Sequence, residues 1–128
     1  MAKYLSREHI LETGDIEVVE LEIPEWGGSV LVRELTTAEV EHFSLRTSTS
    51  RGDLDISRMS GLRAEVVSWA LVDESGQQIM HKKDAEALQK KSHRVIDRIF
   101  NKVIDLSGLN PDEEDEEGEE GEGEQKKA

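Results

Sequence analysis

The chain has 128 residues, of which 35% are hydrophobic, and it carries a formal net charge of −13. This length suits a single domain with tails, and the negative charge argues against nucleic acid as a partner because its field repels phosphate. The absence of cysteine excludes disulfides and thiolate metal sites. Neither a signal peptide nor an apolar run of ~18 residues indicates export or membrane contact, so we expect a protein of the cytoplasm.

Composition divides the chain near residue 110. Of the 45 hydrophobic residues, 44 lie in residues 1–110, and only this segment can bury a core. Residues 111–128 carry ten acidic residues and two lysines, a net charge of −8, and have almost nothing to bury. The sequence therefore predicts a compact domain over 1–110 and a disordered acidic tail over 111–128. The core of so small a domain is modest, so a partner or self-association would add stability.

A short N-terminal helix is the first predicted element. Ser6 is in position to cap it, and Ile10 and Leu11 supply apolar side chains at helical spacing. Gly14 ends it. We expect this helix to pack on the rest of the domain.

A β-hairpin is predicted next. Apolar and charged residues alternate over 16–23, and a second strand is predicted over 29–35. Pro24 stops the first strand, and Gly27-Gly28 allows the positive φ that a tight reversal needs. The second strand is apolar on both faces near its start, so both faces are predicted to be covered. A lone hairpin is marginally stable in water, so this one must pack on helices.

Helices make up the rest of the predicted domain. Thr36 and Glu39 form a capping box, and the apolar stripe of the helix that follows consists of Val40, Phe43 and Leu45. Residues 46–53 are polar and predict a loop. A second helix is predicted over 58–72 from apolar residues at helical spacing, namely Met59, Leu62, Val66 and Trp69.

The end of the domain has the strongest helical pattern. After a turn at 73–78 and a short helical piece at 85–88, apolar pairs recur every four residues in Val95/Ile96, Ile99/Phe100 and Val103/Ile104. This helix is predicted over 93–107, with Ser92 at its start and Gly108 as its C-terminal cap. The predicted fold is therefore α+β and mainly helical, with an N-terminal helix and one β-hairpin packed on several helices.

No pattern of catalytic or metal-binding residues stands out. The histidines, His9, His42, His81 and His93, lie in separate segments without ligand spacing, and the acidic tail lacks the alternating ligands of a calcium loop. Nucleotide-binding glycine loops and a nucleophile elbow are missing, and the tripeptide Arg-Gly-Asp at 51–53 is too short to carry weight. We expect neither a cofactor nor an enzyme.

The order of several short motifs resembles the tail assembly chaperones of long-tailed, siphovirus-type bacteriophages. The segments "VELEIPEWGGSVLVRELTTAEVEHF", "LRAEVVSWALVDESGQQIM" and "DAEALQKKSHRVIDRIFNKVIDLSGLN" carry the family's "P-x-W-G-G", "V-R-E-L-T", "V-D-E-x-G" and "L-x-x-K-S" steps in order. The resemblance spans about residues 4–110. It implies a protein without catalytic motifs that acts during assembly, in the cytoplasm of the host bacterium, and is not kept in the mature virion.

The resemblance also implies partners. Such chaperones are thought to coat the tape-measure protein before the tail tube polymerises around it, and a longer frameshifted form contacts the tail tube protein. The predicted helices over 58–72 and 93–107 would offer the tape-measure protein an apolar groove. An acidic inhibitor or nucleic-acid mimic is the alternative, although most of the charge lies in the tail and not on a folded face.

Candidate partner-binding residues are Trp26, Gly27, Gly28, Arg33 and Leu35. Two interpretations of Trp26, at the hairpin tip, stay open. An exposed Trp would anchor a partner, because Trp is enriched at binding hot spots. Alternatively, the ring folds back over the core, which is the interpretation we favour.

Gln125, Lys126 and Lys127 are candidate codons for ribosomal frameshifting. They can be written CAA AAA AAG, which contains the slippery heptamer A AAA AAG. A ribosome that slips back one base there would make a longer protein, for which the acidic tail would serve as a flexible linker. The alternative is that these are ordinary polar residues of the tail.

Overall fold

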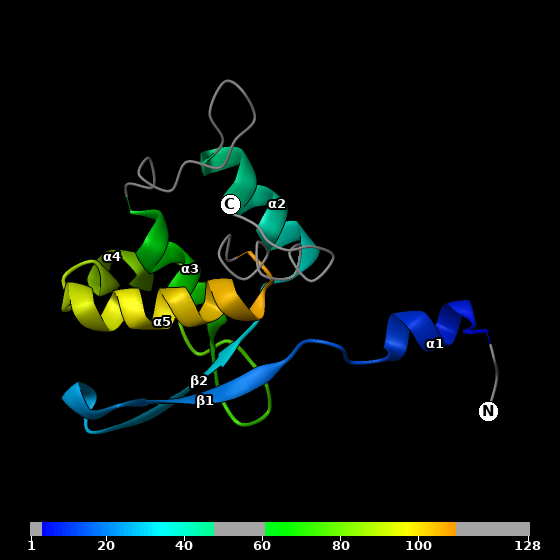
Figure 1. Ribbon diagram of the computed structural model, residues 1–128, viewed down its shortest axis with the longest axis horizontal. Helices are drawn as coiled ribbons and strands as arrows, with labels where there is room; N and C mark the ends of the chain where they lie inside the picture. The colour runs from blue at the N-terminus through cyan, green and yellow to red at the C-terminus, as the bar shows by residue number, and fades with distance from the viewer. Residues whose placement is uncertain (1–3, 48–60, 110–128) are drawn as a thin grey trace, which may run out of the picture.

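A small antiparallel sheet and several helices make up the computed structural model, which describes residues 4–47 and 61–109 (Figure 1). The elements in chain order are α1 (Arg7–Glu12), β1 (Val18–Ile23), the 3₁₀ turn η1 (Pro24–Trp26), β2 (Gly28–Arg33), α2 (Thr37–Thr47), α3 (Leu62–Ala70), β3 (Leu71–Val72), α4 (Asp84–Leu88) and α5 (His93–Leu106). The predicted α+β, mainly helical fold is confirmed. Predictions for Met59, for residues 48–53 of the loop and for the tail at 111–128 lie outside the described residues.

The sheet has the order β1-β2-β3 and is antiparallel throughout. The predicted hairpin is confirmed, with Val19 opposite Val32 and Leu21 opposite Val30. These residues share the inner face, which α5 covers in Figure 1. Ile23 and Val32 are fully buried there. Because successive side chains of a strand point to opposite faces, every second residue lies in the core and the others lie on the outer face.

The third strand differs from the prediction, which continued the helix to residue 72. The helix α3 ends at Ala70, and Leu71 takes an extended conformation with φ −78° and ψ 121°. Leu71 and Val72 then pair with Val32 and Leu31 of β2. Pairing supplies hydrogen bonds that the second edge of β2 needs, and this tertiary gain overrides the helical periodicity of the local sequence.

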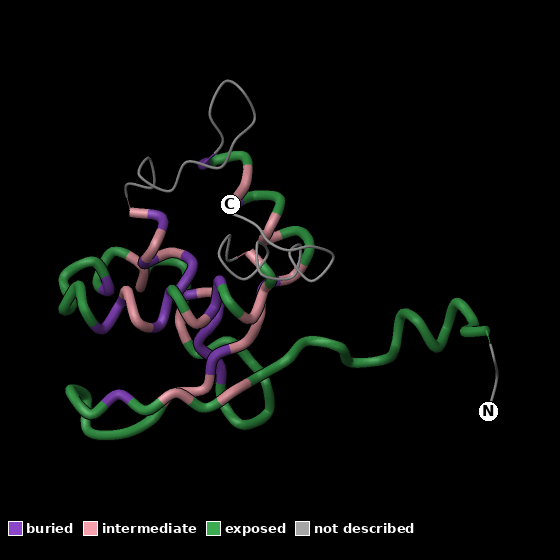
Figure 2. The backbone as a smooth tube through the Cα atoms, in the orientation of Figure 1, coloured by how far each residue is buried: buried purple, intermediate pink, exposed green. Residues whose placement is uncertain are grey.

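The core lies between α3, α5 and the inner face of the sheet (Figure 2). All six residues of the predicted pairs on α5 are buried: Val95, Ile96, Ile99, Phe100, Val103 and Ile104. The α3 helix adds Leu62, Val66, Val67 and Ala70, each with no exposed surface. The predicted amphipathic helices are therefore confirmed, and their apolar faces are packed on one another.

The predicted stop of the last helix is also confirmed. Gly108 has φ 74°, its N–H donates to the carbonyl of Asp105 at 3.2 Å, and the N–H of Leu109 donates to the carbonyl of Ile104 at 3.0 Å. These two bonds form a Schellman motif, in which the residue after the helix adopts the left-handed conformation. Ser92 occupies the N-cap position without a side-chain hydrogen bond.

Two apolar segments that were predicted to be buried are exposed. The helix α1 has no buried residue, with Ile10 57% and Leu11 67% exposed, and it lies apart from the rest of the fold in Figure 1. An extended segment separates α1 from the sheet, so the side chains of α1 do not reach the core. Leu45 is 82% exposed because it follows the buried Phe43 by two residues, about 200° around the helix.

The outer face of the sheet is only partly covered, contrary to the prediction of cover on both faces. Val72 is 3% exposed, whereas Val18 is 40% exposed. The helices α3 and α5 cover the inner face, α1 lies apart, and the segment after β3 reaches the outer face (Figure 1). No helix among the described residues has the length and apolar character to cross a membrane.

Candidate partner-binding site

The hairpin tip brings three of the five predicted site residues together. Trp26 ends the 3₁₀ turn, and Gly27 follows it with φ 79° and donates its N–H to the carbonyl of Pro24 at 3.0 Å. Gly28 then begins β2. Trp26 is 37% exposed and is not part of the core, so the favoured interpretation, that its ring folds over the core, is wrong.

An ion pair ties the tip to the last helix. Arg98 of α5 donates from both terminal nitrogens to the two carboxylate oxygens of Glu25, at 2.8 and 2.7 Å. These hydrogen bonds hold the pKa of Glu25 at about 2. The pair joins the turn that carries the exposed Trp26 to α5. This ion pair could not be predicted, because 73 positions separate the two residues and no spacing rule connects them.

The other two predicted site residues lie at the opposite end of β2. Arg33 donates to both carboxylate oxygens of Glu39 at 2.8 Å. Glu39 also accepts from the Thr36 N–H at 3.0 Å and donates its own N–H to the Thr36 hydroxyl at 3.2 Å. The predicted capping box is therefore confirmed, and Arg33 extends it into a network that joins β2 to the start of α2.

Burial and hydrogen bonding act against each other in this network. Burial raises the pKa of Glu39, but hydrogen bonds from Arg33 and Thr36 outweigh it and hold that pKa below its ordinary value. The Glu39 side chain is 23% exposed and that of Arg33 is 13% exposed. An ionised pair with so little contact with solvent stabilises the fold. It leaves the Arg33 guanidinium few exposed donors with which to bind a partner.

Leu35 is a residue of the core. The residue is 4% exposed, and its N–H donates to the Ser107 hydroxyl at 2.9 Å. This bond joins the link between β2 and α2 to the end of α5. The five predicted site residues therefore form two groups, an exposed tip (Trp26, Gly27 and Gly28) and a structural base (Arg33 and Leu35).

The predicted apolar groove on the helices is not available. The α3 and α5 stripes that would line it pack against each other and against the sheet, with Val66 and Ile99 fully buried. Among residues 4–47 and 61–109, no three side chains of the metal-binding types are grouped to hold an ion, and all four histidines are exposed.

The comparisons with known proteins agree with this architecture. A model of the phage tail assembly chaperone family matches residues 12–122. No curated protein matched the sequence. Among solved structures, the tail assembly chaperone of bacteriophage HK97 is similar in fold, with a TM-score of 0.56 and 16% identity, over 77% of this chain and 90% of that one. The resemblance that the motifs indicated is confirmed, and the chain belongs to the phage tail assembly chaperone family.

Proposed function

We propose that this protein binds the tape-measure protein of a long-tailed, siphovirus-type phage in the host cytoplasm and leaves it before the virion matures. The observation that carries the proposal is the family match over residues 12–122. A tape-measure protein is long, helical and apolar in places, so it needs cover until the tube encloses it. The net charge of −13 would keep a loaded complex in solution.

Co-purification tests this partnership. The full chain carries an affinity tag and is expressed together with the tape-measure protein of the same phage. We expect the two to elute together, and an unrelated acidic protein of similar charge, tagged in the same way, to elute alone. Elution of the tape-measure protein from neither column, or from both, would remove the proposal.

The exposed tip supplies a matched pair of variants for the same experiment. Trp26→Ala removes the indole of a residue that is 37% exposed, and Leu45→Ala removes the apolar side chain of an α2 residue that is 82% exposed. If the tip contacts the partner, the Trp26 variant retains about ten-fold less tape-measure protein and the Leu45 variant retains as much as the wild type. Equal retention would assign the contact to another surface.

We also propose that some ribosomes shift frame at the codons of Gln125, Lys126 and Lys127. The longer product would begin with the same 127 residues and would recruit the tail tube protein. Expression of the gene with its downstream region should yield a second, larger product with the same N-terminus. A gene that reads CAG AAG AAG, or yields one product only, contradicts the frameshift and leaves the chaperone proposal in place.

A further inference from the structure

The outer face of the sheet carries apolar side chains from separate parts of the chain. Val18 is 40% exposed and Ile79 is 48% exposed, and Leu31 lies half-buried between them. The strand register places Val18 and Leu31 on one face, because Val18 is opposite Arg33 and Leu31 is opposite Val72. An apolar surface assembled from distant segments and left uncovered is typical of an interaction site.

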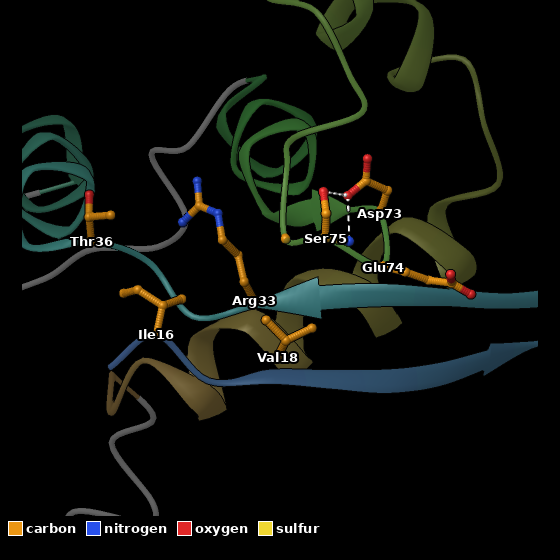
Figure 3. A pocket seen from close by; sticks show the side chains of 8 residues that line it. Ile16, Val18, Arg33, Thr36, Asp73, Glu74 and Ser75 are labelled. Carbon is orange, nitrogen blue, oxygen red and sulfur yellow. Dashed lines mark hydrogen bonds between the residues drawn. The ribbon is translucent and has the colours of Figure 1, made fainter. Parts of the chain in front are cut away.

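This face is hollowed into two adjoining depressions of about 490 and 420 Å³, which share Asp73 and Glu74 as lining residues. Figure 3 shows the first, with Ile16 and Val18 on one side and the turn that carries Asp73 on the other. We call the joined depressions the acidic groove and define it by Val18, Glu20, Leu31, Asp73, Glu74 and Ile79. Its floor is apolar and its rim carries carboxylates.

The rim has a surplus of negative charge. Within the described part of the chain, Glu20 and Glu74 are exposed and form no ion pair. Asp73 accepts hydrogen bonds from the Ser75 hydroxyl at 2.7 Å and the Gln77 N–H at 3.0 Å, which lower its pKa and keep it ionised. Arg33 also lines the first depression (Figure 3), but it is already paired with Glu39. A positively charged ligand would therefore meet carboxylates without a counter-ion.

The backbone groups of β2 and β3 at the groove are already paired, and the unpaired edge of β1 points along the plane of the sheet and not out of its face. This limits the conformation of a ligand. The strand β2 lies between β1 and β3, and β3 pairs on its other side with Gln78 and with the N–H of Ile79. The groove therefore offers side chains and not free backbone groups. A ligand that lies on side chains alone must satisfy its own backbone hydrogen bonds, as a helix does.

We propose that the acidic groove binds a cationic amphipathic helix of a partner protein. Its apolar side lies on Val18, Leu31 and Ile79, and its Lys or Arg residues lie beside Glu20 and Glu74. A second copy of this chain is a poor occupant, because each copy carries a net charge of −13 and like charges repel. The inference rests on the proposed function only in that a tail protein would supply the helix.

A labelled synthetic peptide tests the groove on the full chain. The probe is an 18-residue helix with Leu on one face and Lys on the other, and the same helix with Glu in place of Lys is the peptide control. Binding is followed by fluorescence anisotropy. We expect the Lys peptide to bind and the Glu peptide not to bind, because only the former complements the rim.

Variants with matched charge separate the groove from general attraction. Glu20→Lys with Glu74→Lys reverses the rim, and Glu41→Lys with Glu86→Lys makes the same change in net charge at exposed positions outside the groove. The first pair should weaken binding by about ten-fold or more, and the control pair by no more than about two-fold. Ile79→Ser should weaken binding by about five-fold. Circular dichroism should show that all variants are folded.

Three results would overturn the groove. An equal loss of binding in both double variants would mean that the Lys peptide is attracted to the net negative charge of the chain, including that of residues 111–128, and not to the groove. A wild-type dimer in sedimentation that becomes monomeric in Ile79→Ser would mean that a second copy occupies the groove. Wild-type retention of the tape-measure protein by the rim-reversed variant would remove the groove and keep the proposed function. Binding of the Lys peptide by a chain that does not bind the tape-measure protein would keep the groove and remove the proposed function.

Discussion

At the scale of single residues, a charged side chain in a shared motif can serve the fold. Arg33 lies in the "V-R-E-L-T" motif and was a predicted partner contact, but it makes two hydrogen bonds of 2.8 Å to Glu39. Removing either partner would leave the other poorly solvated, which costs more than the pair itself contributes. Arg33 of this motif therefore has a structural role, which is to join β2 to α2.

The Arg33–Glu39 network should show in the pH dependence of stability. The pKa of Glu39 is lowered in the folded chain, so its carboxylate stabilises the fold above the unfolded pKa, and this contribution is lost as pH falls through the folded pKa. We expect Glu39→Gln to lower the free energy of unfolding by about 1–3 kcal/mol near neutral pH. The difference from the wild type should shrink as the solution is made acidic.

Urea melts over a series of pH values measure this difference. Glu41→Gln, at an exposed position on the same helix, is the control and should follow the wild type throughout. A Glu39 variant whose deficit stays constant from neutral to strongly acidic solution would mean that ionisation of Glu39 does not stabilise the fold.

Phe100 is the aromatic centre of the core on α5. It is 2% exposed, its ring centroid lies 6.2 Å from that of Phe43, and the Arg63 guanidinium lies 5.4 Å above the ring. Phe100→Ala should lower the free energy of unfolding by about 3–5 kcal/mol, since truncation of a buried Phe removes its burial and leaves a cavity. Denaturant melts of this variant and of Leu45→Ala measure the cost, and a loss below about 1 kcal/mol would contradict the packing.

At the scale of elements, local determinants decided what could be predicted from the sequence. The helix α5 was predicted with its buried pairs and its end, because periodicity and Gly108 both lie within the segment. The strand β3 could not be predicted, because its conformation depends on pairing with β2, some forty positions away in the sequence. The exposure of α1 was missed for the same reason, since a local pattern does not say where a helix lies.

The end of α5 gives a clean test of one glycine. Gly108 has φ 74°, and a Cβ added there would contact nothing within 4 Å. The cost of Gly108→Ala is therefore conformational, about 1–2 kcal/mol of stability by thermal or urea melts. Gly14→Ala, where φ is not in the left-handed region and space is also open, should be close to neutral. Equal effects of the two substitutions would contradict the Schellman motif.

At the scale of the whole molecule, charge and fold are divided along the chain. The core and the sheet lie in the described residues up to 109, whereas residues 111–128 hold −8 of the net charge of −13. The candidate site was half predictable from sequence. The residues of the tip could be predicted from their amino-acid types. The ion pair between Glu25 and Arg98 and the acidic groove could not, because each joins segments that only the fold brings together.

Removing residues 111–128 should separate stability from solubility. We expect the melting temperature to stay the same and the protein to precipitate at lower ammonium sulfate concentration, because most of the charge is lost. A full-length variant in which the ten acidic residues of this segment are replaced by Gln should precipitate like the truncated chain. A large fall in melting temperature would contradict the division at residue 110.

The soluble fraction of the tape-measure protein shows whether this chain acts as its chaperone. The tape-measure protein of the same phage is expressed alone, with this chain, and with the Phe100→Ala variant, and the amount in the supernatant after centrifugation is measured. We expect the tape-measure protein to be soluble only with the wild-type chain and to sediment with it as one complex. A tape-measure protein that is equally soluble, or equally insoluble, in all three cases would contradict the claim that this protein is its chaperone.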